Sequence, residues 1–436
     1  ISGMGVTRLF HVVGGSLVLA HLILEVGRSN MGATIFVENA GALRVEGGRM
    51  VAIRDSRALV DGADGFGGGG VALVSSGTGT NTLTVTGAST TFLLERNIAT
   101  AGGALYVLST GGGGNTVVVE QGATLTLKNN SATVGTGGGA SLSGAGTNVT
   151  LAGEASQVII ESNTAESRGG GVYAEAKARV SVESGATFIV ENNSATSDTL
   201  GFGGGLYLRD EGTALTMSGN GTTTMISGNT AEISGAGLLS VLGADVLVSS
   251  GANMVVTMNE AVRQSGGGVY LVVEGSTLTV TGAATKVMVS GNKAGQAGAG
   301  LVSGNGADVL VENGAKLAVN GNEATGLQAF GGGVLVQDVG SSLTVSGNGT
   351  QLWVENNTAG LRGGGWASLR GAAVLLSEGA VTIVGNNKAV SEHGGGIFIA
   401  SSSSFTATGY GTQLKIESNT AGRSGGGCYS KSGAAM

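Results

Sequence analysis

The stretch GGGVYAEAKARVSVESGATFIVENNSA, residues 169–195, contains one unit of a repeat that recurs along the chain. It begins with glycines followed by an apolar residue, and it ends at Asn193, three positions after the aliphatic residue Val190. Between these ends apolar and polar residues alternate, as in Val180-Ser181-Val182. Alternation with a period of two is typical of β-strands that bury one face.

The glycine-rich start of this unit, here called the glycine mark, recurs every 31 to 36 residues. A weaker form begins at Gly32 (Gly-Ala-Thr-Ile-Phe-Val). Self-similarity at such a fixed period predicts a solenoid, in which each repeat buries its apolar face only by stacking on its neighbours. The marks begin at Gly68, Gly102, Gly137, Gly169, Gly203, Gly235, Gly266, Gly298, Gly331, Gly363, Gly394 and Gly425.

An asparagine three residues after a Leu, Ile or Val precedes each of the last eleven marks, and Ser56 takes this position in the first repeat. A side-chain amide both donates and accepts, so we expect these residues to stack into a structural ladder at one corner. We also expect them to adopt the left-handed conformation that a corner needs. The ladder asparagines are Asn97, Asn130, Asn163, Asn193, Asn229, Asn259, Asn292, Asn322, Asn357, Asn387 and Asn419.

Each repeat predicts three short strands: one after the glycine mark, one in the middle, and one before the asparagine. We therefore predict an all-β chain that forms a right-handed, single-stranded parallel β-helix, with three strands per coil and 12 to 13 coils of about 32 residues. Residues 1–31 are expected to form a partial coil, residues 32–424 twelve coils, and residues 425–436 the truncated start of another.

Composition excludes several classes of protein. The chain has 85 glycines, no proline and 41% hydrophobic residues, which disfavours disorder and fits strands that are nearly all central in their sheets. The net charge of −7 disfavours nucleic acid as a partner. The single cysteine, Cys428, cannot form an internal disulfide, and no apolar run is long enough to predict a transmembrane segment.

Polysaccharide-cleaving β-helices need clustered carboxylates, so the glutamates two residues before ladder asparagines are candidates. Glu161 and Glu191 fall on adjacent coils, at a separation that suits a retaining glycosidase or a Ca²⁺ site. No histidine lies near them in the repeat, and a solvated charged face is the favoured interpretation. We predict no catalytic residue, no metal site and no cofactor. These glutamates are Glu95, Glu161, Glu191, Glu355 and Glu417.

Two features predict interaction surfaces. Aromatic residues that follow the first aliphatic after a glycine mark should point outward and could contact glycans, form a lateral interface, or only pack across coils. Longer loops end in Phe66, Phe202 and Phe330, and we expect these loops to protrude. The outward aromatic face comprises Phe36, Tyr106, Tyr173, Tyr207, Tyr270, Phe398 and Tyr429. Possible N-glycosylation sites, if the source is secretory and eukaryotic, are Asn129, Asn148, Asn192, Asn220, Asn348 and Asn356.

The alternation of Gly-Gly-Gly/Ala-aliphatic marks with x-x-Asn elements resembles the repeats of polymorphic outer-membrane (Pmp-like) proteins and related surface β-helix proteins. The chain departs from that pattern in having an aliphatic residue three positions before each asparagine, where the family has Phe, and Gly-Gly-Ala only at Gly102. The resemblance implies a surface-exposed passenger with an adhesive or coat role.

We therefore predict an extracellular structural or adhesive rod at a cell surface, a segment of a larger surface protein or filament, without catalysis. Its expected partners are further copies of itself, joined end to end or side by side, or other surface proteins and glycans. Two alternatives stay open: a glycan-binding adhesin that uses the aromatic face, and a polysaccharide lyase or hydrolase.

Overall fold

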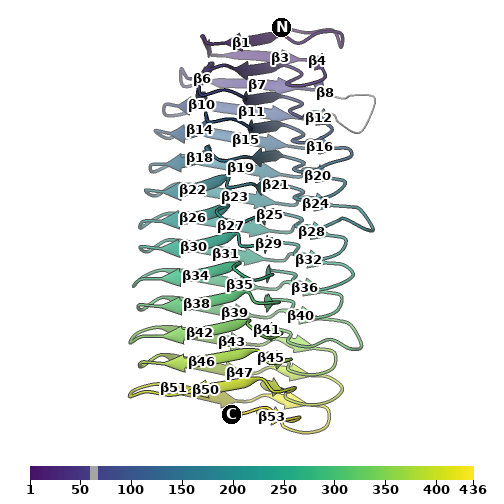
Figure 1. The fold of residues 1–436 in the computed structure, drawn as a ribbon, viewed down its shortest axis with the longest axis vertical. Coiled ribbons are helices and arrows are strands. Elements are labelled where there is room, and N and C mark those ends of the chain that lie inside the picture. The colour runs from purple at the N-terminus through teal and green to yellow at the C-terminus, as the bar shows by residue number, and fades with distance from the viewer. Residues whose placement is uncertain (59–66) are drawn as a thin grey trace. The chain divides into compact units, whose positions relative to one another are not determined.

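The structure, a computed structural model, describes residues 1–58 and 67–436. In this part of the chain every regular element is a strand, and the fold is a parallel β-solenoid of about 13 turns of about 32 residues (Figure 1). The chain forms two compact units, Ile1–Met225 and Ile226–Met436, and strand β27 (Thr223–Ser227) contains the boundary. Each unit is described by itself below.

Four parallel sheets, here numbered I to IV in the order in which each turn contributes to them, make up unit 1 (Figure 1). Sheet I contains β1 (Phe10–Val13), β5 (Ile35–Glu38), β9 (Val71–Ser75), β13 (Leu105–Ser109), β17 (Ala140–Ser143), β21 (Val172–Glu175) and β25 (Leu206–Arg209). Sheet II contains β2 (Ser16–Leu19), β6 (Ala42–Val45), β10 (Asn81–Thr86), β14 (Asn115–Glu120), β18 (Thr147–Ala152), β22 (Arg179–Glu183) and β26 (Ala214–Ser218). Sheet III contains β3 (Leu22–Glu25), β7 (Met50–Arg54), β11 (Thr91–Glu95), β15 (Thr124–Lys128), β19 (Gln157–Glu161) and β23 (Thr187–Glu191). Sheet IV contains β4 (Arg28–Ser29), β8 (Arg57–Ala58), β12 (Ile98–Ala99), β16 (Ser131–Ala132), β20 (Thr164–Ala165) and β24 (Ser194–Ala195).

Unit 2 repeats the same four-sheet plan. Its sheet I contains β29 (Leu238–Val241), β33 (Val269–Val272), β37 (Leu301–Gly304), β41 (Val334–Gln337), β45 (Trp366–Leu369), β49 (Ile397–Ile399) and β53 (Cys428–Ser430). Its sheet II contains β30 (Asp245–Ser249), β34 (Thr277–Thr281), β38 (Asp308–Glu312), β42 (Ser342–Ser346), β46 (Ala373–Ser377) and β50 (Ser404–Ala407). Its sheet III contains β31 (Asn253–Thr257), β35 (Lys286–Ser290), β39 (Lys316–Asn320), β43 (Gln351–Glu355), β47 (Val381–Gly385) and β51 (Gln413–Glu417). Its sheet IV contains β28 (Thr230–Ala231), β32 (Glu260–Ala261), β36 (Lys293–Ala294), β40 (Glu323–Ala324), β44 (Thr358–Ala359), β48 (Lys388–Ala389) and β52 (Thr420–Ala421).

The predicted all-β parallel solenoid is confirmed, and each turn has four strands where the sequence predicted three. The additional strand, in sheet IV, is only two residues long and directly follows the ladder asparagine, as in Thr164–Ala165. Two residues are too few to show an alternating pattern, which is why the sequence does not reveal this strand.

Alternation places one row of each strand inside the coil. Strand β23 shows this pattern, because Phe188 and Val190 are buried while the residues between and beside them are partly exposed. Parallel strands pair in register, so Val190 lies beside Ile160 of the preceding turn. A small void of about 40 Å³ lies in the interior of unit 1, and its lining is aliphatic and aromatic, with residues such as Leu142, Val158 and Phe188.

The left-handed corner is occupied by the residue before each ladder asparagine, and not by the asparagine itself as the sequence suggested. These preceding residues have φ between 52° and 65°. Gly, Asn and Ser are frequent there because glycine and short polar side chains tolerate this conformation. The set comprises Asp55, Arg96, Asn129, Ser162, Asn192, Gly228, Met258, Gly291, Gly321, Asn356, Asn386 and Ser418.

Candidate functional site

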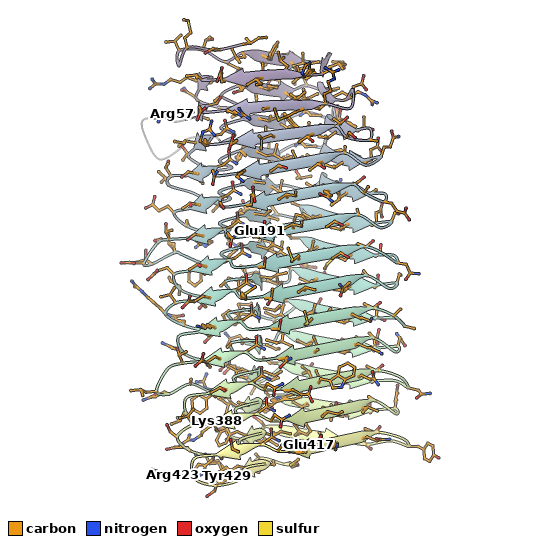
Figure 2. The ribbon with its side chains drawn as sticks, turned by 180° about the vertical axis from the view of Figure 1, so that it is seen from behind. Arg57, Glu191, Lys388, Glu417, Arg423 and Tyr429 are labelled. Atoms are coloured by element: carbon orange, nitrogen blue, oxygen red, sulfur yellow. The ribbon has the colours of Figure 1, made fainter. Side chains whose placement is uncertain are left out.

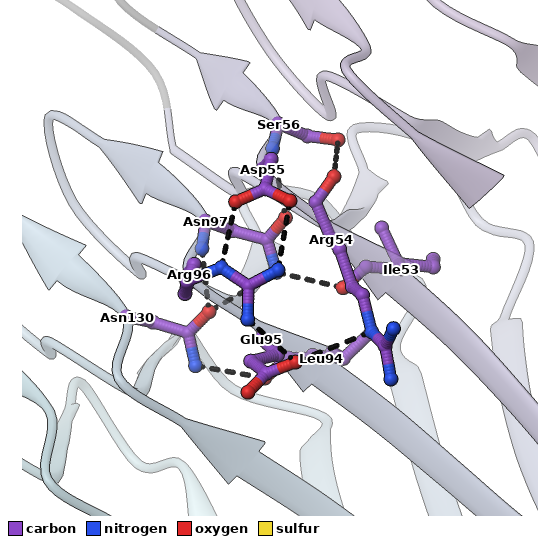
Figure 3. A network of polar contacts seen from close by, with 9 residues as sticks. All are labelled: Ile53, Arg54, Asp55, Ser56, Leu94, Glu95, Arg96, Asn97 and Asn130. Atoms are coloured by element: carbon purple, nitrogen blue, oxygen red, sulfur yellow. Dashed lines mark hydrogen bonds and ion pairs between the residues drawn. The ribbon is translucent and has the colours of Figure 1, made fainter. Parts of the chain in front are cut away.

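The ladder asparagines are buried, and their side chains connect consecutive turns within each unit (Figure 3). The Oδ1 atom of Asn130 accepts two hydrogen bonds from Asn97 of the preceding turn, from the backbone N–H at 2.9 Å and from Nδ2 at 3.0 Å. The Nδ2 group of Asn130 donates to the carbonyl of Leu94 and to Oδ1 of Asn163, each at 2.9 Å. All four bonding positions of the amide are thus used inside the protein.

The same geometry recurs in unit 2, where Asn259 donates to Oδ1 of Asn292 at 2.9 Å and to the carbonyl of Ile226 at 3.0 Å. Ser56 ends the ladder in unit 1 by donating its backbone N–H to Asn97 at 3.1 Å. A buried amide that satisfies every donor and acceptor stabilises one register between turns. The geometry therefore gives the asparagine column a structural role.

The third residue of the glycine mark packs against the ladder. A Cβ atom placed on Gly171 would lie 3.1 Å from Cγ of Asn193, and one on Gly268 would lie 2.9 Å from Nδ2 of Asn292. The first residue of the mark has positive φ in every described mark, between 55° at Gly32 and 85° at Gly68. These two constraints explain why the corner is rich in glycine.

Ion pairs lie on the outer surface of the same corner in unit 1 (Figure 3). The guanidinium of Arg96 donates to both oxygens of Asp55, at 2.8 and 2.9 Å, and also pairs with Glu95 at 2.9 Å. These hydrogen bonds from Arg96 hold the pKa of Asp55 below its ordinary value. Arg54 pairs with Glu95 at 3.2 Å on the adjacent strand, so this glutamate lies between two guanidinium groups.

The candidate carboxylate pair lies in a column that contains a lysine. Register places Glu95, Lys128, Glu161 and Glu191 on successive strands of sheet III, and Glu191 is labelled in Figure 2. The ammonium of Lys128 contacts Glu161 at 2.5 Å, and this hydrogen bond raises the pKa of Lys128. Lys128 therefore places a positive charge between Glu95 and Glu161 in this column. The sequence-based prediction did not include this lysine because it considered only the glutamates. Glu355 and Glu417 lie in unit 2, separated in their column by Gly385.

Each of the three histidines contacts a different side chain. His11 pairs with Glu38 at 2.8 Å, His21 lies within 3.4 Å of Arg49, and His393 stacks on Tyr429 with ring centroids 4.2 Å apart. Within residues 1–58 and 67–436, no group of three or more His, Cys, Asp or Glu side chains could hold a metal ion.

The predicted outward aromatic face is wrong in one respect: the rings point away from the coil interior but are covered. Tyr173 is 4% exposed, Tyr207 is 7% exposed and Phe398 is 1% exposed. Phe36 is buried as well, and Tyr106, Tyr270 and Tyr429 are partly buried. The cause is the segment between sheet IV and each glycine mark, which folds back over sheet I. In unit 2, Ala297 and Phe330 of this segment pack against the outward side chains of sheet I, among them Phe398.

A second apolar layer therefore lies outside sheet I in each unit. In unit 1 the Tyr173 and Tyr207 rings stack at 5.3 Å, and Arg168 lies 5.9 Å above the Tyr207 ring. In unit 2, the guanidinium of Arg362 lies over the neighbouring rings of Phe330 and Phe398, at 5.7 and 5.4 Å from their centroids. Burial raises the pKa of the Tyr106, Tyr173, Tyr207 and Tyr270 hydroxyls.

The phenylalanines of the longer loops do not protrude. Phe202 and Phe330 are half-buried, and the backbone of each forms a β-bridge to an arginine of a neighbouring turn, Arg168 and Arg362 respectively. The loops that end in these phenylalanines do carry exposed residues, with Leu327 90% exposed and Leu200 43% exposed. Phe66 lies outside the described residues.

A groove of about 610 Å³ lies between this loop layer and sheet I in unit 2. Its walls come from the loops before two glycine marks, with Gln296 and Ala297 on one and Leu327, Gln328 and Phe330 on the other. Its floor comes from the outward row of sheet I, where Leu335, Gln337 and Leu369 lie on strands β41 and β45. Arg370 completes the lining and pairs with Asp338 at 3.3 Å.

A row of partly exposed apolar side chains runs along the outer face of sheet III in unit 2, and we call it the apolar row. Register places its members side by side on successive strands. Polar residues such as Lys286 and Asn320 flank it. The sequence interpretation missed it, although an apolar residue between two polar positions of the strand before the asparagine was the available signal. The apolar row comprises Val255, Met288, Ala318, Trp353 and Ile383.

All six asparagines in the glycosylation motifs are exposed. Three of them, Asn129, Asn192 and Asn356, occupy the left-handed corner position. Outside residues 59–66, the chain contains no helix with the length and hydrophobicity needed to cross a membrane.

Comparison with known proteins adds little. No protein-family model matches the chain. No curated protein matches it either. One solved structure, described as a crystal structure of the TibC-catalyzed hyper-glycosylated TibA55-350 fragment, matches at 14% identity and a TM-score of 0.25, over 97% of this chain and 100% of that chain. At this TM-score the match carries no conclusion about function, and the fold rests on the geometry described above.

Proposed function

We propose that this protein is an extracellular structural or adhesive protein of a cell surface, without catalytic activity. The observation that carries the proposal is the asparagine ladder, whose buried amides are fully hydrogen-bonded between turns. The residues that recur in every repeat thus hold consecutive turns together. This arrangement suits a structural scaffold that presents its loops and outer sheet faces at regular intervals. The Pmp-like resemblance of the repeats points to the same class of surface protein.

The charge column on sheet III supports a role without catalysis. A retaining glycosidase needs one carboxylic acid whose pKa is raised and one free carboxylate. Glu161 instead contacts the ammonium of Lys128 at 2.5 Å on a partly exposed strand face. We therefore favour the structural role over polysaccharide cleavage. The enzyme hypothesis would be favoured instead if the chain released reducing ends from neutral or uronate polymers and Glu161→Gln abolished that activity.

The apolar row of sheet III supports self-association as part of the proposal. Met288 is 41% exposed, and Trp353 lies between Ala318 and Ile383 on adjacent strands. A contiguous, partly exposed apolar strip with polar margins is consistent with a protein interface. A second copy of the chain, joined side by side, is the partner that we propose for it.

Surface localisation is tested with antibodies raised against the purified chain, applied to intact cells of the source organism. We expect surface labelling without permeabilisation and loss of the signal after brief protease treatment of intact cells. Labelling that appears only after permeabilisation would overturn the proposal.

A glycan-binding adhesin is the second candidate. The rings of Tyr173, Tyr207 and Phe398 are covered, so the aromatic face no longer supports it. The groove on sheet I of unit 2 favours it instead, because that groove combines apolar and amide side chains.

A further inference from the structure

The geometry points to the groove on sheet I of unit 2 as a binding site for an uncharged oligosaccharide. This inference rests on the adhesive form of the proposed function. The groove measures about 610 Å³, which is within the usual range for small-ligand sites of about 300–1,000 Å³.

Three carboxamide side chains reach the groove from three separate segments: Gln296 and Gln328 from two loops, and Gln337 from the end of strand β41. Gln296 and Gln328 are exposed and Gln337 is partly exposed, so each amide is accessible to a ligand. A carboxamide both donates and accepts, as does a sugar hydroxyl, so the two are complementary.

Apolar side chains form a surface between these amides. Leu335 and Leu369 are buried in the floor, and Phe330 is half-buried at the wall. The adjacent strand β37 carries Gly304 in the row that holds Gln337, and the Gln337 side chain lies over this glycine, with its Cγ and Nε2 atoms 3.5 Å from where a Cβ would stand. An apolar patch with a few convergent polar groups suits the apolar faces and hydroxyl rims of pyranose rings.

Charge and topology exclude other ligands for the groove. Arg370 is the one charged residue in its lining, and Asp338 at 3.3 Å balances it, so an anion gains little there. An extended peptide that adds to a sheet needs an open strand edge. Strands β37, β41 and β45 pair with one another on the groove floor and offer no such edge.

The experiment measures binding of the full chain to a panel of neutral hexaoses (cello-, malto-, xylo- and chitohexaose) and to hexagalacturonate as the anionic probe. We expect at least one neutral hexaose to bind. Gln337→Ala should weaken it roughly tenfold, as loss of a desolvated hydrogen-bond partner does. Ala297→Trp, which fills the groove, should abolish binding. Gln413→Ala, at an exposed glutamine on sheet III, is the matched control and should bind as the unmodified chain does.

Three results would each overturn the inference. The chain could bind no neutral hexaose, it could prefer hexagalacturonate, or Gln337→Ala and Ala297→Trp could both bind as tightly as the unmodified chain. Gln328→Ala, at an exposed loop position, provides a second test if Gln337→Ala fails to fold. Surface labelling of intact cells is independent of these results. A chain that labels at the surface but binds no hexaose leaves the proposed function in place and removes this site.

Discussion

At the scale of single residues, a small number of side chains decide how one turn fits the next. The ladder asparagine is the clearest, because one buried amide makes four hydrogen bonds and spans three turns. The residue before it has a different task, since it only needs to adopt positive φ at an exposed position. Two adjacent asparagines, such as Asn129 and Asn130, can therefore differ greatly in their contribution to stability.

We expect Asn130→Ala to lower the free energy of unfolding, because it leaves buried groups of Asn97 and Leu94 without partners. Each orphaned buried group costs about 1–3 kcal/mol. Urea denaturation of the variant and the unmodified chain measures the difference. Asn129→Gly is the matched control, because glycine accepts positive φ without strain, and its midpoint should stay the same or rise. Equal midpoints for both variants would show that the ladder is not a major source of stability.

Buried hydroxyl groups provide a second test at this scale. Within the described residues, Oγ1 of Thr382 is buried and has no hydrogen-bond partner. Thr382→Val replaces that hydroxyl by a methyl group of similar size, so we expect a neutral to stabilising change of up to about 2 kcal/mol. Thr285→Val is the contrasting variant, because its hydroxyl donates to Thr281 at 2.9 Å and accepts from Gly251 at 2.9 Å. It should lower the midpoint of thermal unfolding, and a loss of stability in Thr382→Val would contradict this account.

At the scale of the element, the sequence predicted the strands that alternate and missed what lies outside them. Val180, Val182, Phe188 and Val190 reveal sheets II and III because their period of two follows directly from burial of one face. The two-residue strands of sheet IV have no period to read. The covering of Tyr207 depends on how a loop folds back over sheet I, which is a tertiary contact that local pattern does not encode.

The candidate sites divide in the same way. The asparagine column is regular in sequence, so its place at a corner could be predicted. The left-handed conformation was predicted for the asparagine itself, whereas the structure has it at the residue before the asparagine. The groove combines Gln296, Gln328 and Gln337 from different turns. Gln264 and Gln296 both stand two residues before a glycine mark, whereas the strands beside Gln337 carry Gly304 and Leu369 at its position. The sequence therefore shows part of this set as a repeated position but does not show that the three amides line one groove.

The tyrosines beneath the loop layer predict how stability depends on pH. Burial raises the pKa of Tyr106, Tyr173 and Tyr207, so the folded state binds these protons more tightly than the unfolded chain. Their contribution to stability is complete below the unfolded pKa of about 10 and is lost as the pH rises through the folded pKa. We expect the unfolding midpoint to fall above pH 10 in unmodified protein.

The measurement is urea denaturation between pH 8 and pH 11. The triple Tyr→Phe variant at 106, 173 and 207 should have a flatter pH dependence. Tyr410→Phe, at a fully exposed position, is the control and should follow the unmodified chain. If the unfolding midpoint of the triple variant falls above pH 10 as steeply as that of the unmodified chain, the loop layer opens before the tyrosines ionise.

At the scale of the whole molecule, contacts with partners depend on the side chains that stay exposed on the outer faces of the sheets. The apolar row of unit 2 predicts lateral self-association, which sedimentation velocity at increasing protein concentration measures. We expect Trp353→Glu to shift the chain toward monomer, because a charge in the centre of an apolar interface is poorly solvated. Thr344→Glu, at a partly exposed position on sheet II, is the matched control. A chain that sediments as a monomer at all concentrations would contradict the proposed partner.

The most direct test of the structural or adhesive role is immunogold electron microscopy of intact source cells, with antibodies against this chain. The account predicts gold particles on the outer surface, at contacts between cells or between a cell and its substratum. Gold confined to the cell interior of sectioned cells, with none at the surface, would contradict it.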